Sequence, residues 1–386
     1  MSVSVSSPAL PINLLRPAKD WARFVIPLAV ILTFAILFHL LSEGIFFSPR
    51  NLSNLSRQVC VNLTLAVGMT LVILTSGIDL SVGSVLALSG MLAAITQVHG
   101  GLSHWGTFGA ILSFLIALLV GSSAGGFTGY AVSRLKITPF IVSLGMMVIC
   151  RGLTLIVSSA QAVAPIGDSL SSVSSDYLPV TASRICLTIV LAATIASFVY
   201  ALYHRKFTVE SLVAYIGALL FLSLSYFAFV GYRGIPYIAF IAALCAGAAS
   251  LVLRYTRFGR FIYAVGSNRE AAELSGVPVA KTLGLTYLIM GSLAGLAGVM
   301  DVARVNGAVP SAGELAELDA IAAVVIGGTS LMGGIGTIGG TLFGVLMMGV
   351  LNNGMSLIGI NEHYQKVFKG IVIILAVYLD LRSKKK

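Results

Sequence analysis

Carboxylates are rare in this chain, and two stretches place them between apolar segments. Asp79 lies in "TSGIDLSVGS", and Glu317 and Asp319 lie in "ELAELDAIAAVVIGG". A carboxylate in apolar surroundings can bind a proton or a cation, form an ion pair, or cap the free amides of a helix. For Asp79 and its neighbour Ser81, we expect capping of the helix that follows, with a proton or cation site as the alternative.

A second group of charges precedes the glycine-rich stretch "GGTSLMGGIGTIGG". Arg304, Glu314, Glu317 and Asp319 predict a polar vestibule or paired charges at a membrane edge. Glycine-rich loops cradle phosphates in many ATPases, but the G-x-x-x-x-G-K-[ST] pattern occurs nowhere in this chain. We therefore expect glycine-rich turns between short helices here, and no ATP hydrolysis by this chain.

Residue sets typical of metal sites and hydrolytic enzymes are missing from the sequence. The five histidines lie far apart without an H-E-x-x-H pattern, and the four cysteines stand singly in apolar segments without a C-x-x-C pair. The sequence predicts no metal site, no cofactor bound by this chain and no enzyme activity.

The elements that carry these residues are predicted to be membrane helices. Of the 386 residues, 57% are hydrophobic and only 10% are charged. Apolar windows of about 18 to 25 residues, the length that crosses a bilayer, recur along the chain. The fold class is therefore an all-α, polytopic transmembrane bundle of about twelve spans, at residues 24–42, 58–77, 81–98, 107–133, 137–158, 184–203, 211–230, 236–253, 282–302, 316–332, 338–358 and 364–380.

Glycines at a spacing of four residues predict tight packing between these spans, because two helix backbones can approach closely where side chains are absent. Such glycines recur in three of the predicted spans: Gly121, Gly125 and Gly129, then Gly291 and Gly295 followed by Gly298, then Gly340 and Gly344.

Basic loops set the expected orientation in the membrane. The loops "SRLK" and "YHRKF", the stretch 254–281 and the tail "LRSKKK" all fall on one side if the N-terminus is cytoplasmic, whereas the acidic loop 159–183 falls on the other. This pattern explains the net charge of +10 without a nucleic-acid partner. Arg50 and Arg57 break the rule, because this scheme places them outside.

The predicted domain organisation is simple. A cytoplasmic tail at 1–23 precedes one transmembrane domain at 24–381, which carries a cytoplasmic loop at 254–281, and a basic tail follows at 382–386. The first apolar run has no small-residue cleavage site after it, so we expect an uncleaved signal anchor.

The loop 254–281 is the longest polar stretch of the predicted inner face, and it contains "SNREAAELSGV". Asn268 can cap a helix whose first turn holds Glu270, and Gly276 can end that helix after about two turns. With small Ala271 and Ala272 on its surface, such a helix is shaped to enter the groove of another protein.

These residues carry a resemblance to a known family. The pattern E-A-A-x-x-x-G from Glu270 to Gly276 resembles the loop by which permeases of bacterial ATP-binding-cassette importers dock on their ATPase. "GIDLSVGSVLALSG", "GRFIYAVGSNREAAELSGV", "ELDAIAAVVIGGTSLMGG" and "LNNGMSLIGI" resemble, in order, the blocks of the ribose and xylose type of monosaccharide permease. The resemblance covers the chain from about residue 51 onward.

The resemblance implies a homodimer in the bacterial inner membrane that contacts lipid, an ATPase subunit that binds ATP, and a periplasmic sugar-binding protein. It implies that Asn268, Glu270, Ala271, Ala272 and Gly276 couple the chain to the ATPase. It also implies a monosaccharide path with gating residues, for which we expect Asp79, Ser81, Glu317, Asp319, Asn352 and Asn353.

One departure from the shorter ribose type bears on the cargo. Residues 184–253 supply about three spans where that type has one, and a longer form of this kind resembles xylose permeases, which favours a pentose. A proton-coupled secondary sugar carrier is the alternative function, with Asp79 and Asp301 as its candidate acids.

Overall fold

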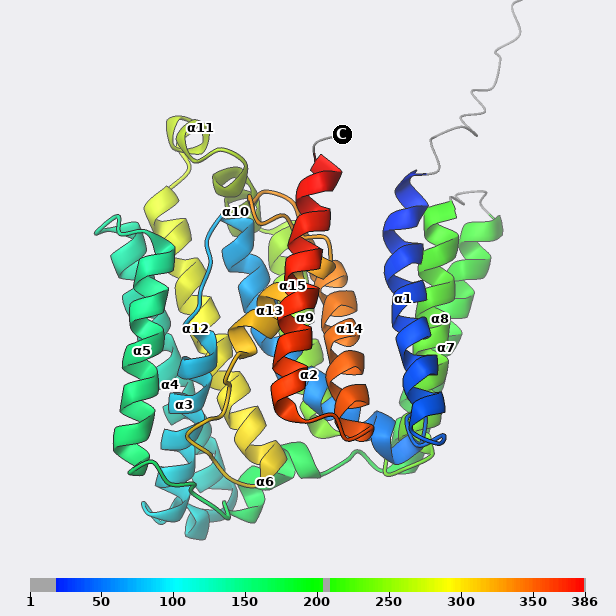
Figure 1. Ribbon diagram of the computed structural model, residues 1–386, viewed down its shortest axis with the longest axis horizontal. Helices are drawn as coiled ribbons and strands as arrows, with labels where there is room; N and C mark the ends of the chain where they lie inside the picture. Colours follow the sequence, from blue (N-terminus) through cyan, green and yellow to red (C-terminus); the bar gives the residue numbers. More distant parts are fainter. Residues whose placement is uncertain (1–18, 204–208, 385–386) are drawn as a thin grey trace, which may run out of the picture.

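The computed structural model describes residues 19–203 and 209–384, and most of the predicted tail at 1–23 lies outside these ranges. Within them the regular secondary structure is helical, apart from two isolated β-bridges. The α-helices are α1 (Lys19–Leu41), α2 (Pro49–Leu74), α3 (Val82–Val98), α4 (Gly106–Ser133), α5 (Pro139–Ser158), α6 (Asp168–Ser175), α7 (Val180–Tyr203), α8 (Val209–Val230), α9 (Tyr237–Tyr255), α10 (Arg257–Ser267), α11 (Arg269–Leu274), α12 (Val279–Val305), α13 (Ala316–Ile326), α14 (Ile338–Leu357) and α15 (Glu362–Lys384) (Figure 1).

Seven of the described helices are long and apolar enough to cross a membrane, and shorter apolar segments lie at Leu28–Leu41, Val82–Val98 and Tyr215–Val230. The helical, polytopic fold class predicted from sequence is therefore confirmed for the described residues.

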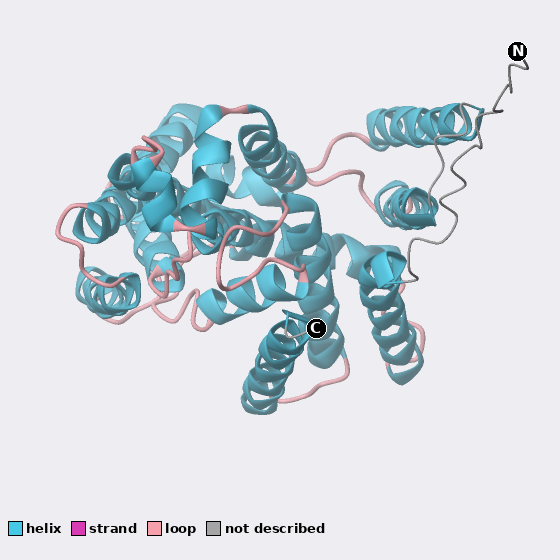
Figure 2. Ribbon diagram, turned by 90° about the horizontal axis from the view of Figure 1, so that it is seen from above, coloured by secondary structure: helices cyan, strands magenta, loops and turns pink. Residues whose placement is uncertain are grey.

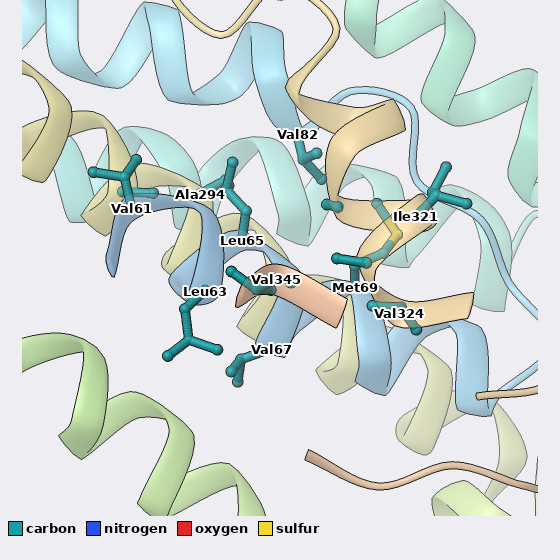
Figure 3. Close-up of a cluster of buried hydrophobic side chains, with 14 of the residues drawn as sticks. Val61, Leu63, Leu65, Val67, Met69, Val82, Ala294, Ile321, Val324 and Val345 are labelled. Atoms are coloured by element: carbon teal, nitrogen blue, oxygen red, sulfur yellow. The ribbon is translucent and has the colours of Figure 1, made fainter. Parts of the chain in front are cut away.

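Helix α2 forms the centre of the bundle. It begins with Pro49 after the N-cap Ser48, whose hydroxyl accepts a hydrogen bond from the Asn51 amide, and most of its residues are buried. Its apolar side chains, among them Leu65 and Met69, pack against α12, α13 and α14 (Figure 3). The second half of α2, from Leu63 onward, is almost entirely apolar, as expected of a membrane helix that is surrounded by other helices.

Helices α4 and α12 are held together by glycines. A Cβ at Gly121 would overlap the backbone of Gly291, and one at Gly125 would overlap the backbone of Tyr287. Gly295 meets the backbone of Ala117 in the same way. The close approach predicted from glycine spacing is confirmed, and it forms the largest contact between any two helices of the described chain.

Two extended segments enter the bundle from opposite ends. After α2, residues 75–81 run back into the bundle before α3 begins, and after α12 residues 306–315 run in from the other end before α13 begins (Figure 1). Helix α13 has 11 residues, which span about 16 Å at 1.5 Å per residue, roughly half of a bilayer core. The predicted span at 316–332 is therefore wrong: the helix ends at Ile326, where Gly327 and Gly328 begin a turn.

Other predicted boundaries also needed correction. The span placed at 58–77 begins at Pro49, so Arg50 and Arg57 lie within α2 and not in a loop. The outer loop 159–183 contains α6, and the loop 254–281 contains α10 ahead of the predicted short helix. In each case the stretch is polar and lacks a long apolar run, which predicts a loop, but the structure forms a helix there.

The region 184–253 contains three helices, as predicted: α7, α8 and α9. The predicted inner connection "YHRKF" lies largely outside the described residues. Helix α7 packs mainly on α8, which in turn contacts α1 and α2. Figures 1 and 2 show α1, α7 and α8 grouped at one side of the molecule.

Candidate functional site

A cavity of about 580 Å³ lies between α2, α12, α14 and α15 and the segment 306–315. Its volume falls in the usual range of small-molecule sites, about 300 to 1,000 Å³. Its lining residues come from the middle of α2, the first turns of α15 and the last turns of α12 and α14. The ends of α12 and α14 and the start of α15 place the cavity toward the end of the bundle opposite α11 (Figure 1).

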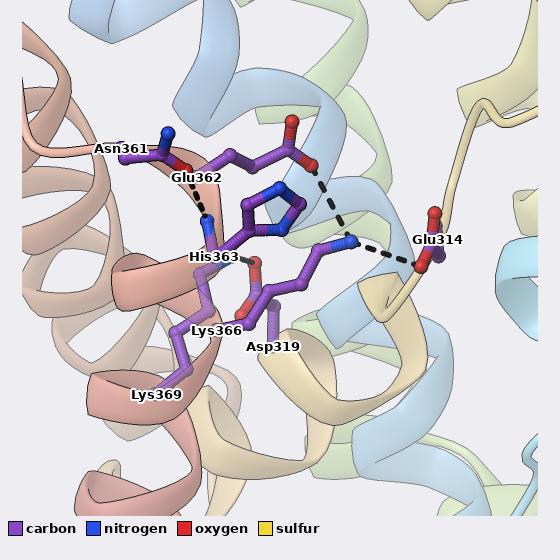
Figure 4. A network of polar contacts seen from close by, with 7 residues as sticks. All are labelled: Glu314, Asp319, Asn361, Glu362, His363, Lys366 and Lys369. Carbon is purple, nitrogen blue, oxygen red and sulfur yellow. Dashed lines mark hydrogen bonds and ion pairs between the residues drawn. The ribbon is translucent and has the colours of Figure 1, made fainter.

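Ion pairs fasten α15 beside this cavity (Figure 4). Lys369 Nζ lies 2.9 Å from Asp319 Oδ2 on α13, and Lys366 Nζ lies 3.0 Å from Glu314 Oε1 in the segment 306–315. Lys366 also approaches Glu362 of its own helix, at 3.6 Å. Glu314 and Asp319 therefore pair with lysines of α15 and not with each other.

Asp319 and Asn352, two of the predicted path residues, both line the cavity. Asn352 Nδ2 donates a hydrogen bond to Asp319 Oδ2 at 3.2 Å. The remaining oxygen of each side chain, Oδ1, is buried without a hydrogen-bond partner among the described residues.

Asn353, the neighbour of Asn352, makes a different contact. It exchanges two hydrogen bonds with Asn51 of α2, at 2.9 and 3.1 Å, and it does not line the cavity. The paired amides join α14 to the start of α2, which indicates a packing role.

The inner limit of the cavity lies where the two extended segments meet. Gly313 lines the cavity and lies against Gly83 in the first turn of α3. Glu317, 8% exposed, places Oε2 beside Gly83, which puts its carboxylate near the N-terminal end of α3. Arg151 of α5 fixes the segment 306–315 by donating hydrogen bonds to the carbonyls of Pro310, at 2.7 Å, and Ala312, at 2.9 Å.

Asp79 and Ser81 lie in the other extended segment and are buried away from the cavity. Asp79 Oδ1 accepts hydrogen bonds from the Ser81 amide, at 2.9 Å, and the Ser81 hydroxyl, at 2.6 Å. Ser81 is the N-cap residue of α3, but its side chain makes no cap bond. The prediction that the Ser81 side chain caps α3 is therefore wrong, and the Ser81 hydroxyl instead donates a hydrogen bond to Asp79 Oδ1.

At the opposite end of the molecule, α11 has the predicted form. Asn268 Oδ1 accepts a hydrogen bond from the Ala271 amide at 2.9 Å, and Gly276 follows the helix with φ +81°, a conformation that favours glycine. Glu270 and Ala271 are exposed, whereas Ala272 is buried. Leu274, which the sequence reasoning passed over, is 90% exposed, so the helix presents an apolar tip to the surroundings.

Helix α11 packs on α10, and α10 in turn contacts the end of α2 and the glycine-rich loop 327–337. The Ser76 hydroxyl donates to the carbonyls of Gly266, at 3.2 Å, and Met332, at 2.7 Å, and the Gly334 amide donates to the Leu74 carbonyl at 3.0 Å. Tyr263 of α10 donates its hydroxyl proton to the Gly336 carbonyl at 2.8 Å. Partial burial raises the pKa of this Tyr263 phenol above its ordinary value.

Lys366 and Lys369 were not among the predicted site residues, because both lie in the predicted membrane span 364–380. The available signal was their spacing of three residues, which places both on one face of a helix. Gln58 and Asn62 of α2, four residues apart, line the cavity and were also missed.

Residues 51–377 match the family described as branched-chain amino acid transport system / permease component. The chain is 36% identical over 379 residues to the xylose transport system permease protein of Haemophilus influenzae, covering 94% of this chain and 96% of that protein. It is 34% identical over 377 residues to the xylose transport system permease protein of Escherichia coli K12, covering 93% and 92%. It is 38% identical over 340 residues to the ribose import permease protein of the same organism, covering 88% of each chain. No solved structure matches it.

Proposed function

This chain belongs to the family of branched-chain amino acid transport system / permease components, and on that premise we propose that it is the membrane permease of an importer for a monosaccharide, with a pentose such as xylose or ribose as cargo. The observation that carries the proposal is similarity over nearly the whole length to xylose and ribose permeases. The polar cavity is large enough for a small neutral ligand, which supports the same function.

Import against a gradient needs energy that this chain does not supply, since it has no phosphate-binding loop. The proposed complex therefore contains two copies of the chain, an ATPase subunit bound at the end of the bundle that carries α11, and a periplasmic binding protein at the end that carries the cavity. Exposed Glu270, Ala271 and Leu274 on α11 are suited to a groove on the ATPase, while buried Ala272 anchors the helix against Val265 and Val279.

The contacts of α10 supply a route from the ATPase to the cavity. A movement of α11 and α10 displaces Gly266, to which Ser76 is hydrogen-bonded, and Ser76 begins the extended segment that ends near Gly83. Gly83 in turn lies against Gly313 at the limit of the cavity. In this mechanism, movement of the segment 75–81 shifts Gly83 relative to Gly313. This shift opens the cavity toward the cytoplasm.

The same scheme fixes the topology that we propose. Both termini and the α10 and α11 end face the cytoplasm, and the cavity faces the periplasm. We propose about twelve crossings, of which α13 is half the length of a span and completes a crossing only together with the segment 306–315. The chain is accordingly a multi-pass protein of the inner membrane.

A proton-coupled carrier, the alternative considered from sequence, is not supported. Asp301 pairs with Arg304 at 2.8 Å, and Asp79 does not line the cavity. The relatives are named as permeases of transport systems, which favours the importer.

Uptake of radiolabelled xylose and ribose into vesicles tests the proposal, with the chain, its ATPase and its binding protein each present or omitted. We expect ATP-dependent uptake only with all three. Uptake by the chain alone, driven by a proton gradient, contradicts the proposal.

A further inference from the structure

Two buried acceptor atoms at the edge of the cavity have no hydrogen-bond partner among the described residues: Asp319 Oδ1 and Asn352 Oδ1. The two residues are 9% and 5% exposed, so water reaches them poorly. The second oxygen of Asp319 already accepts from Lys369 Nζ and Asn352 Nδ2. A buried acceptor without a donor costs folding free energy, and such a cost is commonly retained where a ligand supplies the donor.

Helix α2 offers complementary groups in the lining of the same cavity. Gln58 and Asn62 are half-buried, lie on one face of the helix at a spacing of four residues, and have no side-chain hydrogen bond within the described ranges. A primary amide provides both donors and an acceptor. The lining of the cavity thus contains both free acceptors and free amides.

We propose that the cavity binds a neutral sugar directly, with its hydroxyl protons donated to Asp319 Oδ1 and Asn352 Oδ1 and its hydroxyl oxygens accepting from Gln58 and Asn62. A hydroxyl group is both donor and acceptor, so neighbouring hydroxyls on one sugar ring match this arrangement. The inference rests on the proposed function and adds the residues that receive the cargo inside the permease.

The residues that line the cavity also determine which charge a bound sugar can carry and how tightly it binds. Four carboxylates line the cavity, at Asp301, Glu314, Asp319 and Glu362. They exceed by one the cationic groups that pair with them, those of Arg304, Lys366 and Lys369, so an anionic sugar is disfavoured whereas a neutral one leaves the ion pairs intact. No aromatic side chain lines the described cavity, so the large contact surface of an aromatic ring is missing. Binding is therefore weak, which suits a path from which the cargo must leave again.

Saturation-transfer NMR on the purified full chain in lipid nanodiscs tests this inference without the ATPase or the binding protein. The probes are D-xylose, D-ribose and the anionic D-glucuronate. The variants are Asn352→Leu, which removes the acceptor, and Asp319→Asn, which keeps an oxygen acceptor. Asn361→Leu is the control, because Asn361 is exposed and does not line the cavity.

We expect signals from xylose or ribose but none from glucuronate, with binding weakened about tenfold by Asn352→Leu and much less by Asp319→Asn or Asn361→Leu. Melting curves show whether each variant is folded, and Asp319→Leu replaces Asn352→Leu if the latter does not fold. Equal signals from wild type and Asn352→Leu overturn the inference. So does the absence of any sugar signal from a wild-type chain that supports uptake in the complete importer, a result that leaves the proposed function standing.

Discussion

Gly83 and Gly313 lie so close together that neither position has room for a methyl group: a Cβ on either glycine overlaps the carbonyl oxygen of the other. Gly83 belongs to the first turn of α3, and Gly313, at φ +66°, belongs to the segment that leads to α13. The contact therefore joins the two extended segments that enter the bundle from opposite ends.

Gly83→Ala is expected to impair uptake and to lower the melting temperature, because the added methyl group forces the two segments apart. Overpacking of this kind typically costs about 1 to 3 kcal/mol. The matched control is Gly145→Ala on α5, where a Cβ meets no atom within 4 Å. Equal uptake by the two variants would show that the segments need not touch during transport.

Reversing the charge of Glu270 is expected to weaken the hold of the chain on its ATPase without affecting membrane insertion. Glu270→Lys alters an exposed side chain in the first turn of α11, where a negative charge is favoured by the helix dipole. Co-purification of the ATPase measures the effect, and Glu362→Lys at the opposite end of the molecule is the control. The docking assignment fails if both variants retain the ATPase at wild-type yield.

Gly276→Ala is expected to have a similar effect for a different reason. Its φ of +81° costs an alanine about 1 to 2 kcal/mol, so the turn after α11 shifts or frays. Gly359→Ala is the matched control, since Gly359 has φ +76° but lies at the other end of the bundle. Loss of the ATPase with both variants would mean that general destabilisation, and not the position of α11, is responsible.

Lys369→Ala is expected to destabilise the protein more than Lys366→Ala. The Lys369 pair with Asp319 is mostly buried, and removal of the lysine leaves a buried carboxylate without its counter-ion, at a cost of about 2 kcal/mol or more. Lys366 and its partners are more exposed, so water replaces that pair more easily. Thermal unfolding compares the two variants. The double variant Lys369→Met with Asp319→Leu should recover much of the loss, and a failure to recover would indicate a role beyond charge pairing.

Tyr263→Phe is expected to lower the amount of sugar imported for each ATP hydrolysed while docking persists. The variant removes the hydrogen bond to Gly336 that ties α10 to the glycine-rich loop, worth about 1 kcal/mol. Tyr255→Phe, on the exposed end of α9, is the control. Unchanged coupling in Tyr263→Phe would remove this contact from the proposed route.

The features predictable from sequence were those encoded locally. Apolar length located the helices, the spacing of Gly121 and Gly125 indicated a close helix contact without naming its partner, and Asn268 with Gly276 marked both ends of α11. Each of these signals lies within a few residues of the structure it specifies.

Features that depend on distant segments were not predictable in the same way. The pairing of Asp319 with Lys369, the meeting of Gly83 with Gly313 and the separate tasks of Asn352 and Asn353 arise only when segments far apart in the chain pack together. Adjacent residues such as Asn352 and Asn353 differ by about 100° around a helix, which sequence alone cannot orient without knowing the neighbours.

The most direct test of the central claim, that ATPase action at α11 reaches the cavity, is the reactivity of a cysteine placed at Ala312. Ala312 lines the cavity next to Gly313. In the complete importer, with the four native cysteines replaced, an impermeant maleimide is added from the cavity side with and without bound ATP. The account predicts a labelling rate that differs several-fold between the two states, and that becomes independent of ATP in Gly276→Ala. An equal rate with and without ATP in the otherwise native complex would contradict it.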